Sequence, residues 1–318
     1  MAGVFTPWWR NRRLLPWIVQ AAVGLLLLVL VAFLVGNLVR NLTAAGLLLS
    51  WSWLGNPAGF DISETLLPFD ASLPYWRALL AGLVNTLRVV LVGLVGATLL
   101  GTLVGTASFS SNALLKRLAR IYVELIRNIP LLLQLVFWYF VVFLALPNGT
   151  AAIQLPGVVL AKSGLFLGAP ELVNGVWQSP LKITVEFGAL LTGLVVYTAA
   201  FIAEVVRGGV ASVPQGQWEA AGSLGFSPLQ TLRRIVLPQA LRVIVPGLNS
   251  QYISLAKNSS LAVACGYTDL YSVAETSLNQ SGRAVEVVLI LLGAYLVIDL
   301  LISAVMNGLN GLVQLRER

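Results

Sequence analysis

Residues 212–246 read SVPQGQWEAAGSLGFSPLQTLRRIVLPQALRVIVP, and this stretch predicts two short helices between two hydrophobic segments. Gly225 is expected to end the first helix, because glycine adopts a left-handed turn conformation at little cost. Ser227 can cap the second helix, which carries an apolar stripe and places Arg233 on its polar side. Pro238 is then expected to bend the chain. A plain connection needs only a few residues, so the apolar faces of these helices require a cover, either the protein's own helices or a separate chain.

The sequence on both sides of this stretch is that of a membrane protein. Of its 318 residues, 58% are hydrophobic and only 10% are charged, whereas soluble domains carry about 25% charged residues. This composition excludes a water-soluble enzyme, and it also excludes a disordered chain. Apolar segments long enough to span a bilayer are expected at residues 17–38, 79–107, 129–146, 183–206, 241–265 and 285–313. We therefore predict an all-α membrane protein with about six transmembrane helices.

The basic residues predict which side of the membrane each connection faces. With six spans and an inner N-terminus, 13 of the 20 Lys and Arg residues fall on the inner side, 5 fall in outer loops and 2 lie within spans. Inner loops of membrane proteins are enriched in Lys and Arg, so both termini and the two-helix loop are expected in the cytoplasm. The same bias accounts for the formal net charge of +7 without a nucleic-acid partner.

The composition also excludes several kinds of chemistry. The chain has no histidine and a single cysteine, Cys265, which removes histidine-based nucleophile pairs and histidine or thiolate metal sites. No phosphate-binding G-x-x-x-x-G-K-[ST] motif occurs, so a separate chain must hydrolyse any ATP that is used. We therefore expect a protein that is not an enzyme and that carries no metal or cofactor of its own.

Polar residues inside the predicted spans are the candidates for a substrate path, because ionisable groups are costly in the membrane and are commonly functional there. Lys257 is the foremost candidate, since a lysine beside hydrogen-bonding neighbours in an interrupted helix could hold a carboxylate. The alternative is an internal ion pair of Lys257 with Glu204 or Glu286. For Arg88, near the outer boundary, the alternative is a side chain that snorkels to the interface. The full set of candidates is Asn85, Arg88, Gln134, Tyr197, Glu204, Lys257, Asn258, Ser259 and Ser260.

The two-helix stretch also carries a recognisable motif. The run EAA at residues 219–221, Gly225 and the run IVLP at residues 235–238 resemble the EAA loop of bacterial ABC importer permeases. In that family the loop lies in a groove of a cytoplasmic ATPase subunit and transmits its closure to the spans. The alternatives are a solvated helix residue for Glu219 and a structural turn for Gly225. The resemblance implies a coupling loop at residues 214–238 with these coupling residues: Glu219, Ala220, Ala221, Gly225, Ser227, Arg233, Leu237 and Pro238.

Further segments resemble signatures of polar amino-acid permeases of the histidine/glutamine type. They are YVELIRNIPLLLQ at residues 122–134, YTAAFIAEVVRGG at residues 197–209 and KNSSL at residues 257–261. The similarity covers residues 76–315. The extra first span and the segment FDISE at residues 60–64 resemble the general L-amino-acid branch of these permeases.

The resemblance implies a membrane-spanning subunit of an ATP-driven amino-acid importer, with the type I importer fold, in the bacterial inner membrane. Such a subunit forms half of the translocation pathway. The implied partners are a cytoplasmic ATPase dimer that binds ATP and Mg, a second permease subunit (the same or a related chain) and a periplasmic amino-acid-binding protein. We expect an N-terminal helix and periplasmic segment at residues 1–75 and a permease core at residues 76–318. The outer loops 41–74 and 147–180 are expected to receive the binding protein.

The alternative class is an ion-gradient-driven secondary transporter of small polar solutes. Such transporters commonly contain two internal repeats, and the six predicted spans show no convincing halves. Their inner loops also have no need of a capped two-helix segment.

Overall fold

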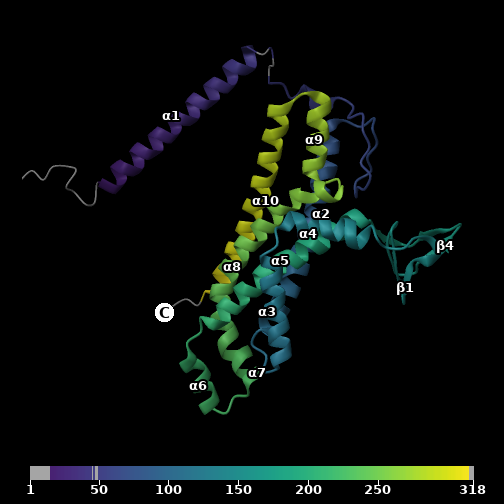
Figure 1. The fold of residues 1–318 in the computed structure, drawn as a ribbon. Coiled ribbons are helices and arrows are strands. Elements are labelled where there is room, and N and C mark those ends of the chain that lie inside the picture. Colours follow the sequence, from purple (N-terminus) through teal and green to yellow (C-terminus); the bar gives the residue numbers. More distant parts are fainter. Residues whose placement is uncertain (1–14, 45, 47–48, 315–318) are drawn as a thin grey trace, which may run out of the picture. The chain divides into compact units, whose positions relative to one another are not determined.

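The computed structural model describes residues 15–44, 46 and 49–314 of a chain that divides into two compact units, residues 1–51 and 52–318. The first unit contains helix α1 (Leu15–Ala44), in which no residue is buried (Figure 1). Its 30 residues exceed the roughly 20 that a bilayer requires, so the first predicted span is present as a helix. Five arginines used in the predicted orientation lie outside the described residues: Arg10, Arg12, Arg13, Arg316 and Arg318.

The second unit is a bundle of helices with short strands at one side, and Figure 1 shows α6 and α7 at the end opposite to α9. Long apolar runs form its main helices, and prolines and glycines delimit the short ones. Its helical segments in chain order are the 3-10 turn Ser52–Gly55, α2 (Tyr75–Ala107), α3 (Ala113–Arg127), α4 (Leu131–Val136), the π-helical segment Phe137–Phe143, the 3-10 turn Gly149–Ala151, α5 (Val185–Ala211), α6 (Gln215–Ser223), α7 (Pro228–Thr231), the π-helical segment Leu232–Val236, α8 (Leu237–Asn258), the 3-10 segment Ser259–Cys265, α9 (Leu270–Ser281) and α10 (Ala284–Val313).

Close contact between α2 and α5 organises the centre of the bundle. Gly101 and Gly105 are buried in α2. A Cβ atom added at Gly101 would lie 2.6 Å from Ile202 Cβ, and one added at Gly105 would lie 2.8 Å from Val206 Cβ. Small residues let helix backbones approach closely in a membrane. The two helices therefore pack with their backbones close together, and α8 packs against α5.

All six predicted spans correspond to helical segments, but fewer of them meet the length and apolarity of a membrane span. Among the described residues, α1, α2, α5 and α10 do so. The third predicted span is α4 with its π-helical continuation, which follows α3 at a bend of 105°; counting this bent pair as one span gives five. The fifth predicted span, α8, falls outside this criterion because polar residues such as Asn249, Gln251 and Lys257 lower its hydropathy. It packs against α5 and α10.

The outer loop predicted at residues 147–180 contains β-structure, so the all-α prediction holds for the membrane helices and not for this loop. Asn174 and Gly175 form the turn of a short hairpin with φ of 52° and 79°, as a two-residue type I′ turn requires. Phe166 and Trp177 are buried between the strands. The strands are β1 (Ile153–Leu155), β2 (Val158–Ala161), β3 (Gly164–Leu167) and β6 (Leu181–Ile183), which form one antiparallel sheet in the order β1-β2-β3-β6, and β4 (Glu171–Val173) and β5 (Val176–Gln178), which form a hairpin.

The segment before α2 packs on the helices of the second unit. Trp53 lies edge-on against Tyr75 with ring centroids 5.1 Å apart, and both are buried in a cluster with Ile62 and with Leu270 of α9. The second compact unit accordingly begins at Ser52, because α2 and α9 cover the apolar side chains of this outer segment. The division at residue 76 between an N-terminal region and a permease core stays a prediction.

Candidate functional site

The coupling segment, residues 214–238, contains two short helices, α6 and α7, at one end of the second unit (Figure 1). Gly225 lies between them with φ of +80°, a conformation in which a side chain would be strained. Ser227 caps α7 through reciprocal hydrogen bonds: Gln230 N donates to Ser227 Oγ over 3.4 Å, and Ser227 N donates to Gln230 Oε1 over 2.9 Å. The predicted turn at Gly225 and the predicted cap at Ser227 are therefore confirmed.

The helix that begins at Pro228 continues beyond the predicted bend. Helical conformation runs through the π-helical segment Leu232–Val236 into α8, and Pro238 lies in the first turn of α8. Proline lacks an N–H donor, and a π-helical turn accommodates an irregular hydrogen-bond pattern within a continuous helix. The structure thus shows a π-helical segment just before Pro238, and the helix that begins at Pro228 runs directly into α8.

Burial divides the coupling segment into two sides. Ala221 and Val236 are buried against the rest of the unit, whereas Leu224 and Leu229 are 76% and 73% exposed. The protein's own bundle therefore covers one side only, and two leucines at the tip have no apolar cover within the part of the chain that is described. The remaining predicted coupling residues are all exposed: Glu219, Ala220, Gly225, Ser227, Arg233, Leu237 and Pro238.

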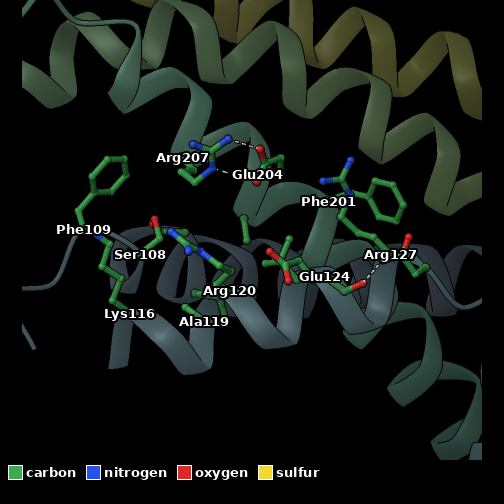
Figure 2. A pocket seen from close by; sticks show the side chains of 15 residues that line it. Ser108, Phe109, Lys116, Ala119, Arg120, Glu124, Arg127, Phe201, Glu204 and Arg207 are labelled. Atoms are coloured by element: carbon green, nitrogen blue, oxygen red, sulfur yellow. Dashed lines mark hydrogen bonds and ion pairs between the residues drawn. The ribbon is translucent and has the colours of Figure 1, made fainter. Parts of the chain in front are cut away.

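A charged pocket of about 690 Å³ lies beside α3, near the C-terminal ends of α2 and α5 (Figure 2). Glu204, predicted in the substrate path, lines it and pairs with Arg207, whose Nε donates to Glu204 Oε2 over 3.0 Å. The guanidinium of Arg127 lies 5.1 Å from the centroid of the Phe201 ring. Glu204 is therefore occupied within this pocket and is not the partner of Lys257. The charged side chains that line the pocket are Lys116, Arg120, Glu124, Arg127, Glu204 and Arg207.

Gln134 and Tyr197 make contacts that hold helices together. Gln134 Nε2 donates to the backbone oxygens of Ile126 and Ile129, each over 2.9 Å, so this side chain braces the 105° bend between α3 and α4. Tyr197 packs against Phe201 with ring centroids 4.9 Å apart. Helix packing accounts for these contacts, and a role of Gln134 and Tyr197 in the substrate path stays a prediction.

Lys257 lies near the end of α8 with an exposed side chain. Its Nζ is 3.5 Å from Asp299 Oδ2 in α10. The predicted ion pair with Glu204 or Glu286 is therefore wrong, and the partner of Lys257 is Asp299. The hydroxyls of Ser259 and Ser260 donate to the backbone oxygens of Ala256 and Lys257, over 2.7 and 2.8 Å. These bonds close the junction between α8 and the 3-10 segment. Asn258, at the same junction, is half-buried.

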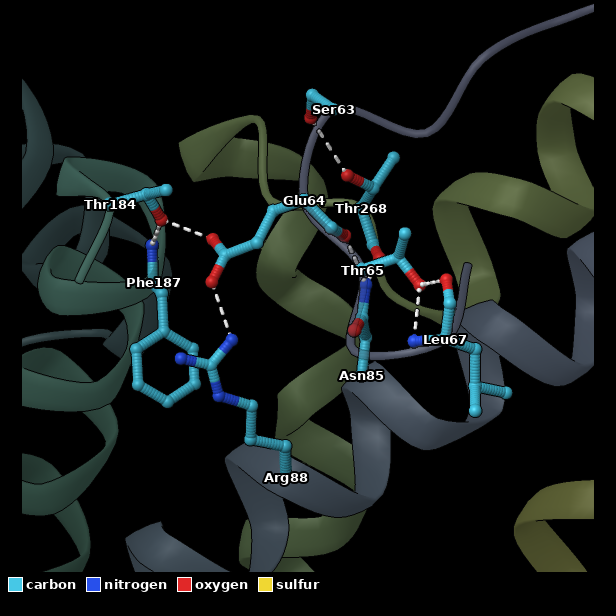
Figure 3. Close-up of polar contacts among 9 residues, drawn as sticks. All are labelled: Ser63, Glu64, Thr65, Leu67, Asn85, Arg88, Thr184, Phe187 and Thr268. Carbon is cyan, nitrogen blue, oxygen red and sulfur yellow. Dashed lines mark hydrogen bonds and ion pairs between the residues drawn. The ribbon is translucent and has the colours of Figure 1, made fainter. Parts of the chain in front are cut away.

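Asn85 and Arg88 meet in a second polar region, the outer cluster, which comprises Glu64, Asn85, Arg88, Thr184 and Thr268 (Figure 3). Arg88 Nη1 lies 2.5 Å from Glu64 Oε1, and the arginine side chain is 18% exposed. Thr184 Oγ1 donates to the other oxygen of the same carboxylate. Asn85 Nδ2 donates to the backbone oxygens of Glu64, over 2.7 Å, and Thr268, over 2.8 Å. Arg88 is therefore held inside the protein and does not snorkel to the interface.

The substrate-path candidates thus occupy separate places: the outer cluster, the charged pocket and the end of α8. Sequence reasoning missed Glu64, Thr184 and Thr268, which are far from Arg88 and Asn85 along the chain. One signal was available for Glu64. It is an acid in an outer segment, and Arg88 was predicted near the outer boundary of the following helix.

Comparison with known proteins gives a consistent result. The family described as "Binding-protein-dependent transport system inner membrane component" matches residues 97–316. The chain is 38% identical to the general L-amino acid transport system permease protein AapQ of Rhizobium johnstonii, over 89% of this chain and 87% of that protein. It is 35% identical to the putative amino-acid ABC transporter permease protein YhdX of Escherichia coli, over 95% of each chain. It is 33% identical to BztB of Rhodobacter capsulatus, a glutamate/glutamine/aspartate/asparagine transport system permease protein, over 94% of each.

Solved structures show the same fold. A crystal structure of an amino acid ABC transporter with histidines matches with a TM-score of 0.56 and 25% identity, over 74% of this chain and 94% of that chain. An inward-facing structure of the MetNI methionine ABC transporter matches with a TM-score of 0.55 and 22% identity, over 75% of this chain and 97% of that chain. The second likeness concerns the fold alone. Together they confirm the predicted fold of an importer permease.

Proposed function

Because the chain belongs to the family of binding-protein-dependent transport system inner membrane components, we propose that it is the membrane-spanning subunit of an ATP-driven importer of L-amino acids. The names of three relatives refer to amino acids: a general L-amino acid permease, a putative amino-acid permease and a permease for glutamate, glutamine, aspartate and asparagine. These names support L-amino acids as the substrate class. Family membership does not favour the alternative of an ion-gradient-driven transporter.

The observation that carries this proposal is the exposed coupling segment. Its two helices are held in a fixed arrangement by the turn at Gly225 and the cap at Ser227, and they leave Leu224 and Leu229 uncovered. Exposed apolar groups that gather in one place mark an interaction site. A groove of a separate ATPase subunit is the partner that the EAA resemblance implies, and the exposed tip supplies the apolar contact.

The mechanism follows from the continuity of the coupling segment with α8. Movement of α6 and α7 on ATP-driven closure of the ATPase dimer would pass into α8 through α7, because α7 runs through the π-helical segment into α8 without a break. The bundle then opens outward to accept an amino acid from a periplasmic binding protein. This chain supplies half of the pathway, and a second permease subunit, the same or a related chain, supplies the other half. ATP and Mg are bound by the ATPase subunits, so the chain itself is not an enzyme.

We assign the membrane orientation from charge. The charged pocket is lined by Lys116, Arg120, Arg127 and Arg207, and the coupling segment carries Arg233 and Arg234. These basic residues favour the cytoplasmic side of a bacterial inner membrane for this end of the unit. The β-sheet region and the outer cluster then face the periplasm. Glu204 and Lys257 remain candidates for the substrate path, the first at the cytoplasmic end and the second near the end of α8.

Reconstitution tests the proposed function directly. The chain is co-expressed with its ATPase and second permease subunits and placed in liposomes that contain ATP, and uptake of a panel of radiolabelled L-amino acids is measured with and without the binding protein. We expect uptake only when ATP, the ATPase and the binding protein are all present. Uptake by this chain alone, driven by an ion gradient, would instead support the secondary transporter.

A further inference from the structure

The side-chain carboxylate of Glu64 lies among hydrogen-bond donors from α2 and from the start of α5 (Figure 3). Its Oε1 accepts from Arg88 Nη1, and its Oε2 accepts from Thr184 Oγ1, the N-cap residue of α5. Its backbone oxygen accepts from Asn85 Nδ2. Unpaired donors are costly when buried, and all of these donors lose a partner if Glu64 leaves. Whatever replaces Glu64 must therefore supply acceptors, preferably anionic ones.

The donors are held in place independently of Glu64. The guanidinium of Arg88 lies 4.0 Å from the centroid of the Phe187 ring, which is itself buried, and this cation–π contact fixes the position of the charge. Thr184 is fixed by its capping bond, in which Phe187 N donates to Thr184 Oγ1 over 3.2 Å. A fixed guanidinium beside a hydroxyl donor is a geometry suited to a carboxylate.

One buried polar atom beside these donors, Asn85 Oδ1, has no hydrogen-bond partner among the described residues. The two carbonyl acceptors of Asn85 Nδ2 fix the orientation of the amide, so Oδ1 is free to accept a bond, as from an ammonium group. The hydroxyl of Tyr267 lies beside Arg88 and interacts with it. Buried polar atoms in native structures normally have partners, and the missing donor at Asn85 Oδ1 suits the ammonium group of an amino acid.

We propose that the outer cluster is a binding site for the α-carboxylate of the transported amino acid, and that Glu64 occupies it as a tethered carboxylate until substrate displaces it. Arg88 and Thr184 receive the carboxylate, and Asn85 Oδ1 accepts from the α-ammonium group. This inference rests on the proposed function, because it assigns a subsite and a gate to the same transport path.

The segment that carries Glu64 is attached in a way that permits displacement. Beyond Glu64, residues 63–66 are linked by side-chain hydrogen bonding to distant parts of the described chain only through the hydroxyls of Ser63 and Thr268, which lie 3.0 Å apart. Its flanks are anchored by buried Ile62 on one side and by Leu67 on the other, both packed in the cluster around α9. The residues between these anchors have no regular secondary structure. A short movement of residues 63–66 would therefore expose Arg88 while the anchors stay in place.

A direct binding measurement tests the role of the Glu64 charge. The probe is radiolabelled L-glutamine, and its binding is measured on the complex of this chain with its second permease and ATPase subunits in nanodiscs without binding protein. If Glu64 competes for the site, the apparent affinity is reduced by the fraction of time that the site is occupied. We expect Glu64→Gln to tighten binding about three- to tenfold on this basis. Asp61→Asn is the matched control, because it removes a charge from the same segment at an exposed position with no ion-pair partner in the described chain.

The site should recognise the α-carboxylate of the amino acid. L-glutaminamide, in which the α-carboxylate is replaced by an amide, is expected to compete at least about tenfold more weakly than L-glutamine, since the charge-assisted bonds to Arg88 are lost. Arg88→Gln is expected to abolish this discrimination. Equal competition by the two compounds in the wild-type complex would overturn the proposal, as would unchanged binding in Glu64→Gln. If Glu64→Gln lowers thermal stability and binding together, Glu64 has a structural role at this place. That result would also overturn the proposal.

A disulfide tests the movement. Ser63→Cys with Thr268→Cys replaces two hydroxyls that lie 3.0 Å apart, near enough for a bridge, while native Cys265 is buried. Oxidation is expected to lower binding and uptake about tenfold or more by holding Glu64 on Arg88, and reduction should restore both. Ser63→Cys alone, treated with the same oxidant, serves as a control, and the double variant is compared between its oxidised and reduced forms. A cross-linked complex that binds and imports normally would overturn the proposal.

These results separate the inference from the function on which it rests. Uptake is measured in the same preparations with ATP and binding protein. If the wild-type complex imports amino acids and the Glu64 and disulfide variants behave like wild type, the proposed displacement of Glu64 is overturned. The proposed function is then unaffected. A complete complex that imports none of the amino-acid panel overturns the proposed function.

Discussion

The exposed ammonium of Lys257 offers a test of the substrate path at the scale of a single residue. Its side chain is 62% exposed and its distance to Asp299 is 3.5 Å, so the ion pair adds little to stability. We expect Lys257→Met to leave assembly of the complex unchanged and to lower ATP-driven uptake about tenfold or more, since a hydrogen bond to a charged group contributes about 1.5–3 kcal/mol. Uptake per assembled complex in proteoliposomes is the measurement.

Asp299→Asn is the matched variant for Lys257. It removes the partner of the ion pair and keeps the lysine, so it should retain most of the uptake if Lys257 meets the substrate. If both variants lose uptake equally, the ion pair itself matters and Lys257 leaves the substrate path.

The fate of individual residues shows which contacts a sequence can predict. Gly225 and Ser227 act through their own backbone and the next few residues, so their roles as turn and cap could be predicted from the sequence. Partners far apart along the chain were not: Lys257 pairs with Asp299, and Arg88 pairs with Glu64. Each ion pair depends on which parts of the chain lie together in the fold, and hydropathy does not specify this.

At the scale of elements, the contact between α2 and α5 requires glycine at a position where the two backbones nearly touch. A Cβ atom at Gly101 would lie 2.6 Å from Ile202 Cβ and 2.8 Å from Ala199 O, and Ala199 O is backbone that cannot rotate away. We expect Gly101→Ala to force the helices apart at a cost of about 1–3 kcal/mol, seen as an apparent unfolding midpoint lower by several degrees in a thermal melt of the purified protein.

Gly293→Ala is the control for this packing prediction. Gly293 lies in α10 with no atom within 4 Å of an added Cβ, and alanine favours a helix more than glycine does. Its midpoint should be equal to or above that of the wild type. A Gly101→Ala protein as stable as Gly293→Ala would show that the close approach is not required.

The coupling segment permits a second element-scale prediction, on Glu219 in α6. Glu219 is exposed, and no ion pair among the described residues involves it, so reversing its charge should leave this chain folded. We expect Glu219→Lys to reduce co-purification of the ATPase about tenfold or more, as the loss of a charge contact at an interface costs about 2–5 kcal/mol. Affinity purification through this chain, followed by quantification of the ATPase, is the measurement.

Glu171→Lys gives the same charge reversal elsewhere on the chain. Glu171 is exposed in β4, in the region assigned to the periplasm. Glu171→Lys should therefore leave co-purification of the ATPase unchanged. Wild-type ATPase recovery with Glu219→Lys would contradict the coupling role.

Element types were predictable to the extent that a long pattern supported them. Apolar runs of spanning length identified α1, α2, α5 and α10, whereas α8 contains polar residues and falls short of an apolar span. The strands between residues 153 and 183 have three or four residues each, too short to show a two-residue alternation. Their pairing depends on turn residues such as Asn174 and Gly175.

At the scale of the second unit, one nearly continuous helical path connects the two sites. It begins at Pro228 in the coupling segment, continues through the π-helical segment and α8, and ends in the 3-10 segment at Cys265. Tyr267 and Thr268 follow directly and reach the outer cluster. A displacement of the coupling segment therefore has a short mechanical route to the residues that surround Glu64.

This arrangement requires the coupling segment and the β-sheet region to lie on opposite sides of the membrane, and that requirement is testable. Ser223 in α6 and Ser163 between β2 and β3 are both exposed, and cysteine is nearly isosteric with serine. We expect Ser163→Cys to react with a membrane-impermeant maleimide in intact spheroplasts, and Ser223→Cys to react only after permeabilisation, because the basic coupling end is retained in the cytoplasm. The wild-type chain is the control, since buried Cys265 should not be labelled in either condition. Labelling of Ser223→Cys from outside would reverse the orientation and leave the exposed tip with no access to a cytoplasmic ATPase.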